Sequence, residues 1–179
     1  SIFINTIEEI RKINKNCKVE LLIPDLRLKP NKNEFDINSL KKIINARPDV
    51  LGHNIEAIRR VFANVRKGGN YDLSLQLLKT IKKINKDIPT KSGIMLGFGE
   101  TLNEIIETLK DLRKNDVDFL TIGQYLQPSE NHVKIEKFYK PEEFEELKKI
   151  GFEMGFKHVE AGPLVRSSYR ADKLSSFVQ

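Results

Sequence analysis

The chain has 179 residues, of which 39% are hydrophobic and 31% charged, and its formal net charge is +6 at pH 7. This length predicts one domain, and the apolar content is too high for a disordered chain. No apolar run approaches the ~20 residues that cross a bilayer, and no signal-peptide pattern is present, so we expect neither a membrane-spanning nor a secreted protein. The lone cysteine, Cys17, excludes an internal disulfide framework and a C-x-x-C zinc site. Because the first residue is Ser1 rather than Met, we expect a piece of a longer protein.

The hydrophobic pattern predicts alternating helices and strands. In chain order it predicts a helix over 3–13, a strand over 19–23, a charged surface insertion over 27–37, a helix over 39–46, a strand over 50–55, helices over 56–65 and 71–84, a strand over 92–98, a helix over 102–114, a strand over 119–122, a helix from Pro141 to near Gly151 or Gly155, and a strand from Val159. Thr101 and Glu104 have the spacing of a capping box at the start of a helix.

Strands that alternate with helices of this length predict an α/β fold with parallel pairing. We therefore expect a single domain over 1–179, built as a parallel α/β layer or barrel, with residues 157–179 as a carboxyl-terminal extension. In such folds the functional groups follow the carboxyl ends of the strands. The segments after each strand are therefore the ones to search.

Asn54 and Glu56 follow the second predicted strand. Residues two apart in a strand point to the same side, and an amide beside a carboxylate can bind two adjacent hydroxyl groups, as in a ribose. The alternative is structural: Glu56 begins the next helix and Asn54 caps it.

The third predicted strand ends in a glycine-rich segment that contains Gly93, Gly97 and Gly99, followed by Glu100. Glycines in an apolar strand indicate a close backbone approach to a ligand or a bulge, and Glu100 could meet a ligand ammonium group. The spacing of a phosphate-binding loop is absent. A plain glycine-rich turn into a helix is the structural alternative.

The fourth strand end, from Gln124 through Tyr125 to Gln127, offers backbone groups and an aromatic face for a flat base. His132, on a predicted loop, is more simply structural. Near the end of the chain, Ser167 and Ser168 adjoin two arginines and could bind an anion, lie near a metal, or stabilise a turn.

Four segments in this order resemble the lipoyl synthase family, and the resemblance covers nearly the whole chain. They are residues 48–56 with His53-Asn54-Ile55-Glu56, residues 90–100 with Thr90-Lys91-Ser92-Gly93, residues 123–132 with Gly123-Gln124-Tyr125-Leu126-Gln127-Pro128, and residues 162–169 with Arg166-Ser167-Ser168-Tyr169.

The resemblance implies a partial (β/α) barrel of the radical S-adenosylmethionine type, here without its first strands. It implies an enzyme that inserts two sulfur atoms into an octanoyl group on a lysine of a lipoyl carrier domain, such as a dehydrogenase E2 subunit or the glycine cleavage H protein. The implied cofactors are S-adenosylmethionine and two 4Fe-4S clusters. The implied compartment is the cytoplasm in a bacterium, or the mitochondrial or plastid matrix in a eukaryote.

Site residues also follow from the resemblance. Asn54 and Glu56 would hold the ribose hydroxyls. Lys91, Ser92 and the segment 93–100 would form the methionine-binding strand, and the segment 124–127 the adenine side. Ser168, or as second choice Ser167, would be a cluster ligand. No residue is assigned as catalytic.

The chain departs from the family in its cysteines. The family binds its clusters through two three-cysteine motifs that precede the matching region, and Cys17 belongs to neither. One thiolate and one serine cannot hold a cluster, so we expect this chain alone to be inactive.

Two other functions stay open. One is a non-catalytic relative that binds S-adenosylmethionine or grips a carrier domain. The other is nucleic-acid binding, for which the net charge is the only argument; the lysines are spread along helices as pairs, which is typical of solvated helix faces. We therefore expect no nucleic-acid partner and no membrane partner.

Overall fold

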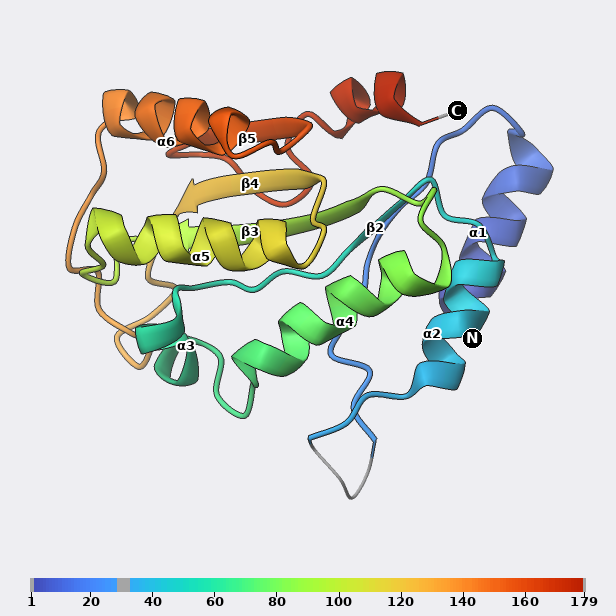
Figure 1. Cartoon of the computed structure of the whole chain (residues 1–179), viewed down its shortest axis with the longest axis horizontal. Coiled ribbons are helices and arrows are strands. Elements are labelled where there is room, and N and C mark those ends of the chain that lie inside the picture. The colour runs from blue at the N-terminus through green and yellow to red at the C-terminus, as the bar shows by residue number, and fades with distance from the viewer. Residues whose placement is uncertain (1, 29–32, 179) are drawn as a thin grey trace.

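The computed structural model describes residues 2–28 and 33–178 (Figure 1). Strands and helices alternate along most of the chain. The elements are α1 (Ile2–Ile13), β1 (Glu20–Leu22), α2 (Ile37–Asn45), β2 (Val50–Gly52), α3 (Arg59–Val65), α4 (Tyr71–Ile84), β3 (Thr90–Leu96), α5 (Leu102–Lys114), β4 (Phe119–Gln124), α6 (Pro141–Glu153), β5 (His158–Gly162) and the 3₁₀ helix η1 (Ala171–Phe177).

The five strands form one sheet in the order β1-β2-β3-β4-β5, and every neighbouring pair is parallel. The spatial order equals the chain order, as in a segment of a (β/α) barrel. All five strands therefore end at the same edge of the sheet, which confirms the predicted α/β fold and brings the predicted strand ends together.

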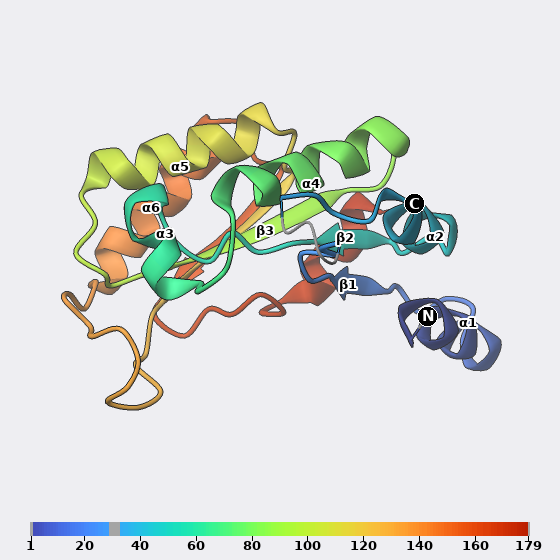
Figure 2. The same ribbon diagram turned by 90° about the horizontal axis from the view of Figure 1, so that it is seen from below.

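Helices cover one face of the sheet, and the chain after β5 runs across the other (Figure 2). Between the sheet and helices α3 to α6 lies the larger apolar core, which includes Leu78, Ile94, Leu109 and Phe144. A second core, which includes Ile7, Leu40 and Leu51, joins α1, α2 and α4 to β1 and β2. We call the face opposite the helices the inner face.

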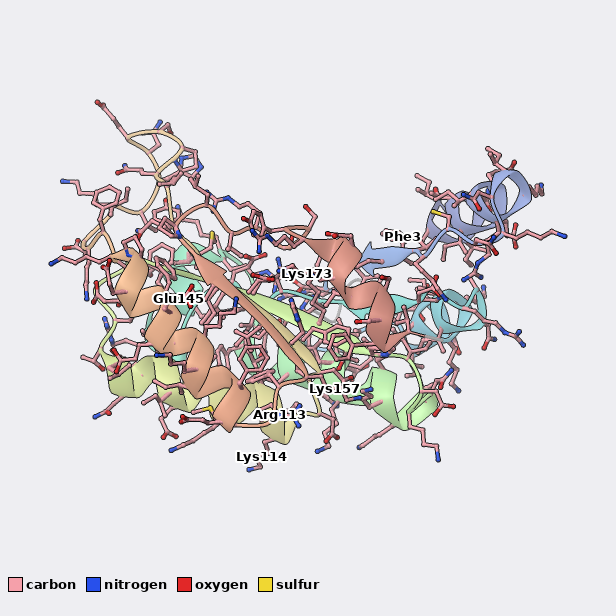
Figure 3. The ribbon with its side chains drawn as sticks, turned by 90° about the horizontal axis from the view of Figure 1, so that it is seen from above. Phe3, Arg113, Lys114, Glu145, Lys157 and Lys173 are labelled. Carbon is pink, nitrogen blue, oxygen red and sulfur yellow. The ribbon has the colours of Figure 1, made fainter. Side chains whose placement is uncertain are left out.

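The chain's last helix, η1, packs on the inner face near β1 (Figure 3). Leu174 is buried there with Val50 and Phe119, and the rings of Phe177 and Phe119 lie 5.5 Å apart. Val50 is the first residue of β2 and Phe119 is the first residue of β4, so η1 covers the inner face where the strands begin. It does not cover the inner face where the strands end. The hydrophobic pattern did not predict this helix.

Several predicted boundaries shift. The strand predicted over 50–55 ends at Gly52, and the helix predicted from Glu56 begins at Arg59. The strand predicted over 92–98 runs instead from Thr90 to Leu96. The Thr101–Glu104 capping box is present as predicted.

The predicted insertion over 27–37 is closed at its base by a bridge between Arg27 and Phe35, and its residues 29–32 lie outside the described part. The carboxylate of Asp36 accepts from the amides of Asn38 and Ser39, so the following helix starts at Ile37, inside the predicted insertion. Within residues 2–28 and 33–178, no helix has the length and apolar character needed to cross a membrane.

Candidate functional site

A cavity of about 170 Å³ opens on the inner face where β2, β3 and β4 end. Alternate residues of β3 and β4 form its floor, and the chain that returns after β5 closes one side. Its lining residues are Asn54, Glu56, Gly93, Ile94, Met95, Thr121, Gly123, Val165, Arg166 and Ser167.

Asn54 and Glu56 both line this cavity, but they lie in an irregular segment after β2 rather than in the strand that the sequence predicted. Glu56 has a left-handed φ of 69°. Its amide donates to the Gly93 carbonyl at 3.0 Å, and its carbonyl accepts from the Met95 amide at 2.8 Å. Since α3 begins only at Arg59, the structural alternative, in which Glu56 starts the helix and Asn54 caps it, is wrong.

The Glu56 carboxyl is partly buried, and burial raises its pKa because a desolvated carboxylate is disfavoured. A hydrogen bond from Asn54 and the positive charge of Arg66 act in the opposite direction. The amide and the carboxyl therefore lie in contact in a sheltered place. This is the pair of groups that can hold two adjacent hydroxyls.

The floor between the two strands is bare backbone at Gly93. A methyl group there would lie 2.6 Å from Thr121 Oγ1 and 3.1 Å from Asn54 Oδ1. Any side chain at this position would fill the space beside Asn54, so glycine keeps the cavity open.

The glycine-rich turn that follows β3 is built around Glu100. Its carboxylate accepts from the amides of Gly97 at 2.6 Å and Phe98 at 2.8 Å, and the side chain is buried. Gly97 and Gly99 have φ values of 127° and 75°, which glycine adopts without strain. None of the predicted ligands in this turn lines the cavity, and both Glu100 oxygens already hold the turn together.

Lys91 and Ser92 lie at the amino end of β3, away from the cavity. Lys91 Nζ lies 2.8 Å and 2.9 Å from the two Glu20 carboxylate oxygens, and its side chain is buried. The Ser92 hydroxyl accepts from the Ile55 amide at 3.2 Å on the opposite face. In this structure both residues make structural contacts.

The predicted adenine side also has internal contacts. The Gln124 side chain donates to the Lys137 carbonyl and accepts from the Tyr139 amide, so it anchors the loop before α6. The Tyr125 ring is stacked 4.4 Å from Phe98.

Gln127 donates to the carbonyls of Ser129 and His132, and His132 Nδ1 lies 2.8 Å from the Ser129 hydroxyl. His132 therefore helps to order its own loop, which is the structural role expected for it.

The two serines after β5 lie in different environments. Ser167 lines the cavity, whereas Ser168 is exposed and is not among the lining residues. The second choice of cluster ligand is thus the one that faces the site. The cavity is also lined by three residues that were not predicted as ligands, Met95, Thr121 and Arg166. Met95 lies two residues from Gly93 on β3, and Thr121 lies two residues from Gly123 on β4, so the strand period would have indicated both.

A 4Fe-4S cluster does not fit the described residues. Cys17 is exposed, between α1 and β1, and the described residues contain no group of three or more His, Cys, Asp or Glu side chains that could hold a metal. Cluster binding needs several thiolates, so these residues do not supply a cluster site. Groups that could bind the ribose of a nucleoside, in contrast, are present in the cavity.

Three larger hollows in the described part of the chain are lined by other residues, and one of them, of about 540 Å³, runs along α6 at Pro141, Glu145 and Lys149. Another, of about 350 Å³, is bordered by Lys82, Arg113 and Asp118, near the amino ends of the strands, and the third, of about 390 Å³, lies among α3, α4 and α5. Because ligands of parallel α/β folds bind at the carboxyl ends of strands, the smaller cavity is the candidate site.

Comparison with known proteins agrees with this fold. The chain is 48% identical over 172 residues to the lipoyl synthase of Halalkalibacterium halodurans and 49% identical over 173 residues to that of Staphylococcus epidermidis. These alignments cover 96% and 97% of this chain but only 54% and 55% of the relatives. The chain thus spans about half the length of the curated relatives it matches.

Two solved structures share the fold. Methylornithine synthase (PylB) superposes with a TM-score of 0.62 at 15% identity, covering 95% of this chain and 56% of its own. SuiB of Streptococcus suis superposes with a TM-score of 0.55 at 11% identity, covering 88% and 36%. At such identities the likeness shows the architecture alone.

The family match includes half of the residues that line the cavity. Residues 3–112, from α1 to α5, match the family described as the Radical SAM superfamily. This range holds Asn54, Glu56 and Gly93 and more than half of the chain. With its parallel sheet and a cavity at the strand ends, the chain belongs to the radical SAM superfamily.

Proposed function

We propose that this chain is part of a lipoyl synthase and that its inner-face cavity binds the ribose of S-adenosylmethionine. The similarity to bacterial lipoyl synthases supports the family, and the observation that carries the site is the placement of Asn54 and Glu56 together beside the bare backbone of Gly93. When bound, S-adenosylmethionine supplies the radical chemistry of the superfamily. The chain's own residues bind, orient and shelter it.

The Asn54 amide can donate to one ribose hydroxyl and accept from the other, and the Glu56 carboxylate accepts from both. Each such bond to a charged group contributes about 1.5–3 kcal/mol. A cavity of about 170 Å³ holds a sugar-sized group. The base and the methionine would then extend along the strand ends, toward the segments 124–127 and 97–100.

The returning chain at Val165 to Ser167 covers the cavity from the side opposite Glu56. A covered, partly apolar site excludes water from a reactive intermediate. In the same proposal Ser167, which faces the cavity, is a better candidate than Ser168 for a ligand of a cluster in the whole enzyme. The thiolate ligands of any cluster would come from residues other than these 179.

The proposed substrate is an octanoyl group on a lipoyl carrier domain, and the proposed reaction inserts two sulfur atoms into it. Since the matched relatives are bacterial, we propose the cytoplasm as the compartment. The alternative is a non-catalytic relative that keeps the nucleoside pocket.

The test uses protein expressed from the whole native reading frame, with iron and sulfide supplied. We expect mass spectrometry to show an octanoylated carrier domain converted to its lipoylated form. Asn54→Ala should weaken S-adenosylmethionine binding in calorimetry by about tenfold or more. Asn103→Ala, at an exposed position on α5, should leave it unchanged. Binding without conversion would favour the non-catalytic relative, and absence of binding by the unmodified protein would overturn the proposed site.

A further inference from the structure

A polar cluster lies next to the cavity but outside it, with His53 buried and Asp25 and Arg66 partly buried. Asp25 follows β1, His53 follows β2, and Arg66 follows α3. Asp25 Oδ1 lies 2.7 Å from Arg66 Nη2 and 3.5 Å from His53 Nε2, and Asp25 Oδ2 lies 3.1 Å from Arg27 Nε. The cluster therefore joins segments that are far apart in the sequence.

Arg66 is the centre of the cluster. Its Nη1 lies 3.3 Å from the Asn54 carbonyl, 3.2 Å from the Ser74 hydroxyl and 3.4 Å from His53 Nε2. Its Nη2 forms an ion pair with the Asp25 carboxylate. One guanidinium thus connects the Asn54 backbone to α4 and to the end of β1, with the fixed fork geometry that only arginine has.

His53 fixes the orientation of this contact. Its side chain is fully buried, and Nδ1 lies 2.9 Å from the Ile23 carbonyl oxygen, so Nδ1 carries the proton and donates. Nε2 of the neutral ring is then an acceptor that faces Arg66. Burial lowers the pKa of His53 to about 4, so the ring stays neutral at physiological pH.

The Asn54 segment needs such support because regular structure does not hold it. β2 ends at Gly52 and α3 begins at Arg59. Between them, the backbone of Glu56 pairs with β3, whereas the carbonyl of Asn54 is held by Arg66. The neighbouring amides of His53 and Ile55 are bonded to β3, so a change at Arg66 removes the side-chain contact that holds the Asn54 carbonyl itself.

We propose that Arg66, held by Asp25, is a positioning residue that sets the Asn54 amide, and with it the Asn54–Glu56 contact, for recognition of the two ribose hydroxyls. This inference rests on the proposed function. Arg27, which also pairs with Asp25 and donates to the Gly68 carbonyl, stands at the base of the 27–37 insertion. The base of the insertion is thereby connected to the site through Asp25.

The test compares calorimetric affinities for S-adenosylmethionine and its 2′-deoxy analogue, in protein from the whole native reading frame. We expect the unmodified protein to prefer the ribose form by about tenfold, the value of one charge-assisted hydrogen bond. Arg66→Ala should reduce this preference to within about threefold. Asp25→Asn should reduce it in part. Arg59→Ala, at the start of the preceding helix α3, removes an exposed arginine paired with Asp72 and should leave the preference unchanged.

The outcomes separate the two proposals. If the unmodified protein does not distinguish the two ligands, the ribose site itself is wrong. If it does and folded Arg66→Ala retains the full preference, the positioning role is overturned. Should Arg66→Ala fail to fold, Arg66→Lys and Asp25→Asn decide: a reduced preference supports the role and an unchanged one refutes it.

Discussion

Gly123 on β4 determines how closely the returning chain approaches the sheet, and replacing it by alanine should move that chain. A methyl group at Gly123 would overlap the Val165 carbonyl oxygen and lie 3.3 Å from Arg166 Nη1. Because the overlapped atom belongs to the backbone, the segment 165–167 must shift. Overpacking of this kind costs about 1–3 kcal/mol. The cavity should widen on that side, with weaker nucleoside binding.

Gly162, the partner of Gly123 on the neighbouring strand, provides the matched control. A methyl group there would make an ordinary contact, 3.4 Å from Val165 Cγ2. Gly162→Ala should therefore be neutral or stabilise by up to about 1 kcal/mol, because alanine restricts the unfolded chain. Free energies of unfolding from urea titrations measure both. Equal values for the two variants would refute the close approach of Val165 to β4.

Three further predictions concern buried titratable groups. Burial raises the pKa of Glu56, so the free-energy cost of burying its ionised carboxylate grows as the pH rises above about 4.5. Glu56→Gln should therefore be more stable than the unmodified protein at pH 7 and should lose this advantage below pH 4, as thermal melts on either side of that range would show. The same variant should bind S-adenosylmethionine more weakly in calorimetry. Glu100→Gln leaves one of the Gly97 and Phe98 amides without its acceptor and should cost about 2 kcal/mol in urea unfolding. Burial lowers the pKa of His53 from 6.5 to about 4, so the protein should lose roughly 3 kcal/mol of stability as the pH falls from 6.5 to 4. Unfolding curves at pH 7 and pH 4 would show this loss. A variant without the imidazole should lack it.

Local patterns in the sequence predict most of the fold. The apolar face of the segment 71–84 and the capping box at Thr101 and Glu104 depend on neighbours three or four residues apart, so both are visible in the sequence. The alternation of helices and strands then predicts the parallel order. The missed helix η1 depends on long-range contacts instead: Leu174 is buried only because Val50 and Phe119 lie beneath it.

The difference between local patterns and long-range contacts also explains which parts of the site could be predicted from the sequence. Asn54 and Glu56 line the same cavity, and their role as ligands stays a prediction; the left-handed backbone at Glu56 was not expected. The contact of Lys91 with Glu20 spans 71 residues, and nothing local to Lys91 indicates it. Residue type and spacing therefore indicate which side chains could bind a ligand, whereas tertiary contacts decide which of them are already engaged.

The most direct test of the central claim is a crystal structure of the protein with S-adenosylhomocysteine. The account predicts the ribose in the inner-face cavity, with its two hydroxyls within hydrogen-bond distance of the side chains of Asn54 and Glu56 and the sugar above Gly93. A ribose bound elsewhere, such as in the hollow among α3, α4 and α5, would contradict it.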